Sequence, residues 1–437
     1  MSSEWPEVAL EDVVGTVNTG LDAIKRAPII EQETGIKCLR IQDISQSKKF
    51  SAWGNTEVRE QDFEKYRLRK NEIIMARTCS PGICLLVKSD MNAVFNNGLA
   101  RVRALEDKIS PVFLLYIFKS KEFADYIYGI SHGTSVQLNM KVGDLTRYRL
   151  RLPPLSVQNG IASILSLMDD RIALLRETNA TLEAIAQALF KSWFVDFEPV
   201  HAKARGEPPQ GMDDATAALF PDSFEESELG RIPKGWRVLP LTDAYDINPT
   251  RKLKKGTVAP YLDMASVATS GHTVSGVTDR ELGSGTKFIN GDTLLARITP
   301  CLENGKTAFV DFLDDEKVAW GSTEFVVLRP KAPLPTYHGY LLSRHPAFRE
   351  YAIQSMSGTS GRQRVQNDVL GRYPVIIPTP NVANTFGGMA TGIQQKIAAN
   401  HQQAQTLAQL RDTLLPKLIS GQLRLPEAEA LLAEELP

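Results

Sequence analysis

The tripeptide Gly-Thr-Ser stands at residues 133–135 and again at 358–360, 225 positions later in the chain. The same offset relates further residues in the same order: Leu145 to Leu370, Arg147-Tyr148 to Arg372-Tyr373, Pro153 to Pro378, and Leu182 to Leu407. Upstream the offset drifts to 220, where residues 72–77 resemble residues 292–297. Matches that keep one order over nearly the whole chain indicate an internal duplication.

Each copy begins with about 150 residues that combine short strands and short helices. Alternation and apolar runs predict strands at residues 72–77, 292–297, 324–328, 147–152 and 372–377. Aromatic residues at helical spacing predict helices at 112–127 and 337–353. The pattern therefore predicts an α+β fold that occurs twice.

Each copy ends in a long helix whose apolar positions follow steps of four and three residues, a heptad seam. The seam residues are Leu165, Ile172, Leu175, Asn179, Leu182 and Leu189 in the first helix, and Ile393, Ile397, Leu407 and Leu414 in the second. Two seams of similar length in one chain most simply pair with each other. A polar residue on such a seam, here Asn179, usually fixes the register. Asn400 and Arg411 interrupt the second seam, so we expect an imperfect pairing there or a partner subunit that faces them.

The composition of the chain limits the classes of protein to which it can belong. The 437 residues suffice for about three domains, and 43% hydrophobic and 23% charged residues are ordinary for a globular protein. No apolar run is long enough for a membrane span, and the N-terminus does not look like a signal peptide. Four cysteines without a Cys-x-x-Cys pair suit a reducing cytoplasm. Residues 1–155 and 236–380 each carry a charge of +3, which is a weak signal for nucleic acid, and two ordinary globular domains with acidic surface segments explain this charge more simply.

Motifs that would support chemistry are missing or incomplete. The Gly-Lys-Thr string at 305–307 resembles the end of a phosphate-binding loop, but Pro300 occupies the position where that loop needs glycine. The six histidines are scattered, and no amino-methyltransferase tetrapeptide is present. We therefore expect no catalytic residue, no metal site and no cofactor in this chain.

Polar side chains next to predicted strand ends are the candidates for contacts to base edges, where Arg suits guanine and Asn or Gln suits adenine. In the first copy these are Arg40, Gln42, Asp43, Ser45, Arg77, Thr78, Asn97, His132, Thr134, Ser135 and Asn139. In the second copy they are Arg297, Thr299, Lys306, Ser322, Thr359, Ser360, Arg362, Gln363 and Arg364. For any single one, the ordinary polarity of a solvated loop is the simpler explanation.

Several strings resemble one known family. Residues 182–197 resemble the central helix of the specificity subunits of type I restriction-modification systems (HsdS), and residues 219–224, 232–236 and 414–421 resemble other segments of that family. The resemblance covers essentially the whole chain. On this basis we expect target-recognition domains at 1–155 and 236–380, spacer helices at 156–198 and 381–421, an exposed acidic connector at 199–235, and a C-terminal tail at 422–437.

The resemblance implies a division of labour. This chain would be a non-catalytic, cytoplasmic, DNA-binding subunit with a pseudo-twofold repeat. Each recognition domain would contact one half of a bipartite sequence in double-stranded DNA, and an antiparallel coiled coil would fix the spacer. Two methyltransferase subunits, which bind S-adenosylmethionine, would dock on it, and restriction subunits would add ATP- and Mg-dependent translocation and cleavage. The alternatives are a stand-alone methyltransferase and a coiled-coil scaffold that does not bind DNA.

Overall fold

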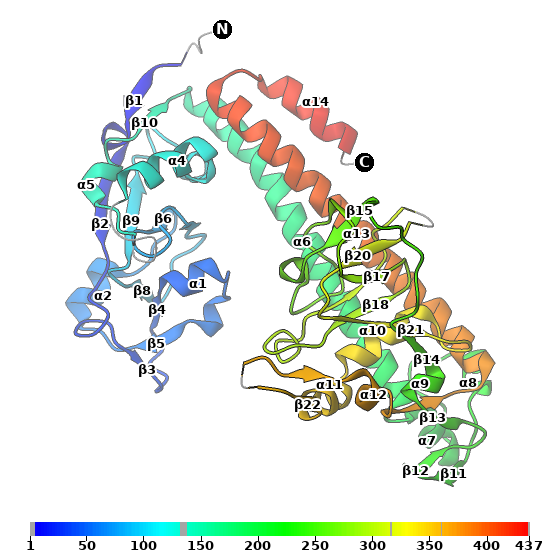
Figure 1. Ribbon diagram of the computed structural model, residues 1–437. Helices are drawn as coiled ribbons and strands as arrows, with labels where there is room; N and C mark the ends of the chain where they lie inside the picture. Colours follow the sequence, from blue (N-terminus) through cyan, green and yellow to red (C-terminus); the bar gives the residue numbers. More distant parts are fainter. Residues whose placement is uncertain (1–4, 132–137, 315–316, 360, 436–437) are drawn as a thin grey trace. The chain divides into compact units, whose positions relative to one another are not determined.

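The computed structural model describes residues 5–131, 138–314, 317–359 and 361–435. It divides into two compact units, the first made of residues 1–172 and 405–437 and the second of residues 173–404. Two long helices, α6 (Leu155–Phe194) and α13 (Pro380–Ser420), contribute residues to both units (Figure 1).

Two four-stranded sheets form the framework of the first unit. One has the order β2 (Val14–Thr19), β9 (Leu99–Ala104), β6 (Glu72–Ala76), β7 (Cys84–Leu86), and the other has the order β3 (Ile29–Ile30), β5 (Gly54–Thr56), β4 (Lys37–Leu39), β8 (Ala93–Phe95). The first sheet is antiparallel, whereas β4 and β8 run parallel. A short pair, β1 (Glu7–Ala9) with β10 (Arg149–Arg151), completes the strands.

Strand β6 is buried along its whole length because both of its faces are covered. Ile73 and Met75 belong to a core that includes the helical part of the unit, while Ile74 and Ala76 belong to the core shared with β4 and β8. Successive side chains of a strand point to opposite faces, so a strand covered on both sides is apolar throughout. This explains the continuous apolar run that predicted it.

Short helices surround these sheets. They are α1 (Ile41–Ser45), α2 (Glu60–Tyr66), α3 (Pro111–Lys119), α4 (Lys121–Ile130), α5 (Val142–Leu145) and α14 (Leu425–Glu435), with single turns at Leu10–Asp12 and Phe50–Ala52. The predicted helix at 112–127 is two helices, because Ser120 breaks the first one and accepts a hydrogen bond from the Phe123 amide as the N-cap of the second.

The second unit repeats the strand order of the antiparallel sheet of the first unit, whereas its other sheet repeats only the order of β5, β4 and β8 and has its fourth strand at the opposite edge. One sheet runs β14 (Tyr245–Ile247), β21 (Phe325–Pro330), β18 (Thr293–Ala296), β19 (Thr307–Phe309), and the other runs β16 (Thr278–Glu281), β15 (Val258–Leu262), β20 (Ala319–Gly321), β17 (Thr286–Phe288). Again one pair in the second sheet, β15 with β20, is parallel. The predicted α+β class with two similar domains is confirmed.

The remaining strands of the second unit form pairs, and the helices around them are short. The strand pairs are β11 (Phe224–Ser227) with β12 (Gly230–Pro233), β13 (Arg237–Pro240) with β24 (Pro374–Ile377), and β22 (Met356–Ser357) with β23 (Arg364–Val365). The helices are α7 (Glu198–Ala204), α8 (Asp214–Ala218), α9 (Leu241–Ala244), α10 (Thr336–Arg344), α11 (Pro346–Gln354) and α12 (Asn367–Leu370), with one turn at Met264–Ser266.

The long helices pack along the predicted seams in each unit. In the first unit Leu165 and Leu414 lie in one core, and Ile172 and Leu407 are also buried. In the second unit Asn179 contacts Ile397 and Asn400, whereas Trp193 contacts Phe386. Residue numbers rise along α6 as they fall along α13, so the pairing is antiparallel. The other seam positions, Leu175, Leu182, Leu189 and Ile393, are buried or half-buried.

The second helix ends at Ser420, and Gly421 follows it with φ +73, the left-handed conformation that closes helices. Asn400 and Arg411, the two polar interruptions of the seam, have partners inside the helix pair: Asn400 bonds Asn179 and Arg411 bonds Asp169. The expectation of an imperfect pairing at these positions is therefore wrong.

The segment at 199–235 is also not the exposed connector that the sequence suggested. It forms α7, α8 and the β11–β12 hairpin, and its Val200 and Phe220 are buried in the core of the second unit beside Trp193 and Trp236. The acidic side chains lie on the surface of a folded segment, so an excess of acidic residues does not by itself show that a segment is an extended, exposed connector. The C-terminal tail is the amphipathic helix α14, whose Ala428 and Leu432 join the core of the first unit.

Candidate nucleic-acid interface

In the first unit, the end of β6 and the segment around Asn139 form one hydrogen-bonded frame. The Met140 amide donates to the Arg77 carbonyl over 2.8 Å, and the Cys79 amide donates to the Leu138 carbonyl over 3.0 Å. Thr78 and Asn139 are therefore opposite one another as an antiparallel bridge. Four of the predicted contact residues, Arg77, Thr78, Asn97 and Asn139, come together here.

The second unit builds the same frame. The Val365 amide donates to the Arg297 carbonyl and the Thr299 amide donates to the Gln363 carbonyl, each over 3.0 Å. Ile298 and Arg364 are the bridge partners. The predicted residues Arg297, Thr299, Gln363 and Arg364 thus come together at the position that corresponds to the first frame.

The two frames share their backbone and differ in their side chains. Arg77 corresponds to Arg297, but Asn139 corresponds to Arg364, and the carbonyl that accepts from the arginine amide belongs to Gly98 in one unit and Glu324 in the other. A common backbone that presents different donors and acceptors can contact two different sequences with the same geometry.

Within the first frame, Arg77 organises the loops. Its Nη1 donates to the Asn97 carbonyl over 2.9 Å, and its Nη2 donates to Oδ1 of Asn139 over 3.1 Å. The side chain of Asn97 is exposed and makes no hydrogen bond with any residue that the structure describes. Arg77 therefore positions the frame, and Asn97 is the side chain left available for a ligand.

The second frame has a comparable pairing. Arg364 forms a bidentate ion pair with Glu324, with its Nη2 2.6 Å and its Nε 2.9 Å from the two carboxylate oxygens. The hydrogen bond from Arg364 lowers the pKa of Glu324 and raises the pKa of Arg364 itself. Arg362 is exposed, and its guanidinium has no partner in the described part of the chain. Glu324 was not among the predicted residues, because only the fold places it opposite Arg364.

Arg40 and its neighbours form a separate group at the start of α1. Asp43 is only 1% exposed, and its carboxylate accepts from the backbone amide and the Nε of Arg40. Asp43 therefore orients Arg40 rather than contacting a ligand itself. Gln42 and Ser45 are exposed on the same short helix.

The remaining predicted residues are distributed less tightly. Lys306 donates from Nζ to the Met264 carbonyl over 2.7 Å, and Ser322 accepts from the Glu324 amide. Thr359 is exposed in the loop before β23. His132, Thr134, Ser135 and Ser360 lie outside the described residues, so the repeated Gly-Thr-Ser string is described only in part.

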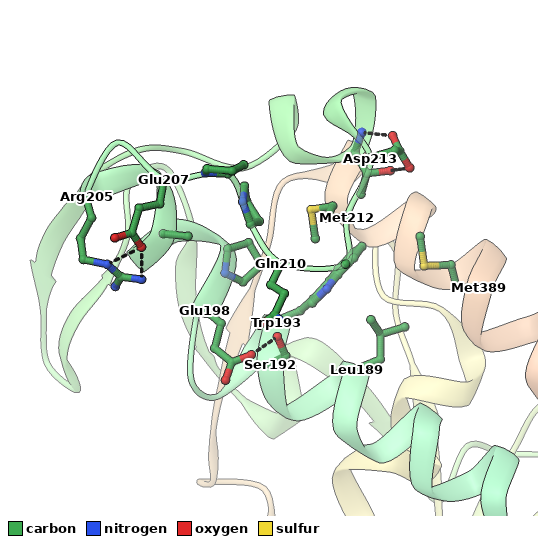
Figure 2. Close-up of a pocket in the computed structure, with 16 residues that line it drawn as sticks. Leu189, Ser192, Trp193, Glu198, Arg205, Glu207, Gln210, Met212, Asp213 and Met389 are labelled. Atoms are coloured by element: carbon green, nitrogen blue, oxygen red, sulfur yellow. Dashed lines mark hydrogen bonds and ion pairs between the residues drawn. The ribbon is translucent and has the colours of Figure 1, made fainter.

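A cavity of about 450 Å³ lies elsewhere in the second unit, between the end of α6 and the segment at 205–213 (Figure 2). Trp193, Met212 and Met389 line it, and polar pairs lie around it: Ser192 donates to Glu198 over 2.6 Å, and Arg205 pairs with Glu207. Among the described residues, no group of three His, Cys, Asp or Glu side chains could hold a metal ion. No helix in the described ranges is long and apolar enough to cross a membrane.

The chain is similar in sequence to proteins of known type. Residues 2–184 match the family described as the type I restriction modification DNA specificity domain. The chain is 27% identical to the MjaIX type I restriction enzyme specificity subunit of Methanocaldococcus jannaschii over 82% of this chain and 79% of that protein. It is 23% identical to the HindI specificity subunit of Haemophilus influenzae, over 96% of this chain and all of that protein.

A solved structure shares the fold. The S subunit of a type I restriction-modification system from M. genitalium superposes with a TM-score of 0.55 at 15% identity, covering 95% of this chain and 96% of that one. The likeness shows a shared fold over nearly the whole length of both chains.

Proposed function

We propose that the chain is a specificity subunit of a type I restriction-modification system and that it selects a bipartite sequence in double-stranded DNA, with one recognition domain for each half. The observation that carries the proposal is the duplicated frame, with the same backbone bonds around Arg77 and Arg297 but different side chains in each unit. Two equivalent sites with different chemistry suit an asymmetric target.

The partners and the chemistry follow the family. The paired helices α6 and α13 set the spacer and carry two methyltransferase subunits, and restriction subunits complete the assembly. In this proposal the chain itself works in the cytoplasm, catalyses no reaction and holds no cofactor. S-adenosylmethionine, ATP and Mg are bound by the partner subunits.

Mapping methylated adenines tests the proposal. The chain is produced with its methyltransferase subunits in a host that lacks adenine methylation, and the modified positions are read across the genome. We expect one bipartite sequence, and replacing residues 1–155 by the first domain of a relative should change only one half of it. Methylation without any sequence preference, or a change in both halves, would refute the proposal. Methyl transfer by the isolated chain would favour the stand-alone enzyme.

A further inference from the structure

A basic cavity of about 500 Å³ lies on the first unit, away from the Arg77 frame. It is lined by Thr16 and Asn18 of β2, Arg101 and Arg103 of β9, Lys65 of α2, and Arg69 in the segment that follows α2. The only acidic residue in its lining is Glu64, which is exposed and 3.9 Å from Arg69. Four cations with hydroxyl and amide groups beside them are suited to an anion with several oxygens.

The floor of the cavity is rigid. Arg101 is 3% exposed, donates from Nε to Oδ1 of Asn18 over 3.2 Å and from Nη2 to the Lys65 carbonyl over 3.1 Å, and pairs with the buried Glu72. These bonds connect β2, β9 and the end of α2, so the cavity is held in shape without a ligand.

The upper part of the cavity keeps unused donors. Arg103 uses its Nε for Glu72 over 2.7 Å, while its Nη groups have no hydrogen-bond partner among the residues that the structure describes. Lys65 and Arg69 are exposed, and the Lys65 ammonium makes no hydrogen bond within the described chain. The available groups are therefore positive and point to a ligand that accepts hydrogen bonds.

The second unit shows that a buried carboxylate with two arginines does not by itself create such a cavity. There Asp292 corresponds to Glu72 and pairs with Arg329 and Arg251. Arg329 donates a hydrogen bond from Nη2 to the Asn290 carbonyl, 2.5 Å away. The residue at the position that corresponds to Arg101 is Val327. The extra cations of the first unit are thus not needed for the fold.

We propose that this cavity, which we name the β2–β9 basic cleft, binds phosphate groups of the DNA backbone; this inference rests on the proposed function. Strand β9 begins directly after Asn97 and Gly98, and Arg103 lies six residues beyond Asn97, about 20 Å along an extended strand. That distance corresponds to about six base pairs of duplex. The cleft thus supplies sequence-independent affinity in addition to the base contacts of the Arg77 frame.

The test uses the full chain assembled with its methyltransferase subunits and a Lys65→Gln/Arg69→Gln variant. Both side chains are exposed, so the fold does not depend on them. We expect the plot of log K against log salt to become about two units less steep, roughly 0.9 per lost phosphate contact, with binding about tenfold weaker at low salt. The loss should be equal for target and non-target duplexes. The charge-matched control is Lys121→Gln/Arg147→Gln, whose side chains are 86% and 76% exposed on the same unit.

Duplexes with a neutral methylphosphonate at single positions locate the contact. We expect to find a phosphate position at which the neutral linkage weakens binding by the wild-type protein but not by the double variant. That phosphate lies at the cleft. If the variant and the control lose equal affinity, or if the cleft binds inorganic phosphate while DNA binding is unchanged, the inference is wrong. In either case a sequence preference of the wild-type protein would still support the proposed function. If the wild-type protein showed no sequence preference, the proposed function would be wrong as well.

Discussion

The side chain of Asn400 donates a hydrogen bond from Nδ2 to Oδ1 of Asn179, 2.8 Å away, between the two long helices of the second unit. Asn179 in turn donates to the Ile397 carbonyl over 3.0 Å. Asn400 is only 3% exposed, so each amide satisfies groups that would otherwise be buried without a partner. The two asparagine side chains can meet in only one register of the helix pair. Two polar residues on the apolar seam therefore specify that register.

Replacing one member of this pair should be worse than replacing both. In Asn179→Leu, Asn400 stays buried without its acceptor, and we expect the free energy of unfolding to fall by about 1–3 kcal/mol. In the double variant Asn179→Leu/Asn400→Leu, apolar side chains replace both, and stability should recover to the wild-type level or above. Urea unfolding measures this. A double variant less stable than either single variant would show that the pair does more than satisfy buried amides.

Asn97 and Arg362 should each control a single half of the target. Both side chains are exposed and unpaired within the described residues, so Asn97→Ala and Arg362→Ala should relax discrimination at one position by about 1–3 kcal/mol, each in a different half-site. Methylated-adenine mapping checks the result. Asn92→Ala and Arg372→Ala, exposed changes of the same residue types, serve as controls and should leave the target sequence unaltered.

A carboxylate in the first unit should make the helix pair sensitive to acid. Asp169 accepts from Arg411 of α13 over 2.5 Å, from Lys119 over 3.0 Å and from the Tyr116 hydroxyl over 2.9 Å. Burial alone raises the pKa of Asp169, but the hydrogen bond from Arg411 and the charge of Lys119 outweigh it, so the pKa lies below its ordinary value of 3.8. The ionised form is therefore the one that stabilises the fold.

The sign of the pH effect follows. A lowered folded-state pKa contributes stability above the ordinary pKa, and this contribution is lost as the pH falls below about 4. Asp169→Asn should therefore be less stable than wild type by about 1–2 kcal/mol at pH 6, with the gap narrowing toward pH 3.5. Chemical unfolding at several pH values measures it. A gap that stayed constant over this range would mean that the charge of Asp169 is not what stabilises the helices.

Much of the fold was predictable because it depends on local periodicity. The seam residues and the strand at Glu72–Ala76 could be predicted from the spacing of apolar residues, because one face of a strand or helix is formed by residues that are close together in the sequence. The fold of the connector was not predictable in this way. Its Phe220 is buried by an edge-to-face contact with Trp193, 27 positions earlier in the chain, and no local pattern records that neighbour.

The site was predictable in composition but not in roles. Several of the polar residues named as candidates near strand ends lie together around Arg77 and Arg297. Which of these side chains already have a partner depends on distant segments of the chain. Arg364 pairs with Glu324, 40 positions away, whereas the side chain of Arg362, two residues before Arg364, has no partner in the described chain. Hydrogen bonding between loops, and not residue type, separates the side chains that hold the frame together from those that are exposed and unpaired in the described chain.

The last prediction concerns the proposed spacer role of the long helices. Helix α6 passes from the first unit to the second after Ile172, and α13 passes between them at Ala404. Insertions belong at these two points rather than near Glu183, because the Glu183 carboxylate accepts from the Tyr340 hydroxyl of α10 over 2.5 Å and a shift there would disturb the second recognition domain. Paired insertions also keep the antiparallel helices matched in length.

Four residues inserted at each point lengthen the helix pair by about 6 Å, which is under two base pairs of duplex at about 3.4 Å each. They rotate each helix by about 400°, close to a full turn, and a coiled coil absorbs the remainder by local unwinding. We therefore expect a target whose two halves are unchanged and whose spacer is longer by one to two base pairs. Two-residue insertions rotate each helix by about 200° and turn the seam away from its partner, so that variant should lose stability and activity. Methylated-adenine mapping distinguishes the outcomes: a fully active four-residue variant with the original spacer would mean that these helices do not set the distance between the two recognition domains.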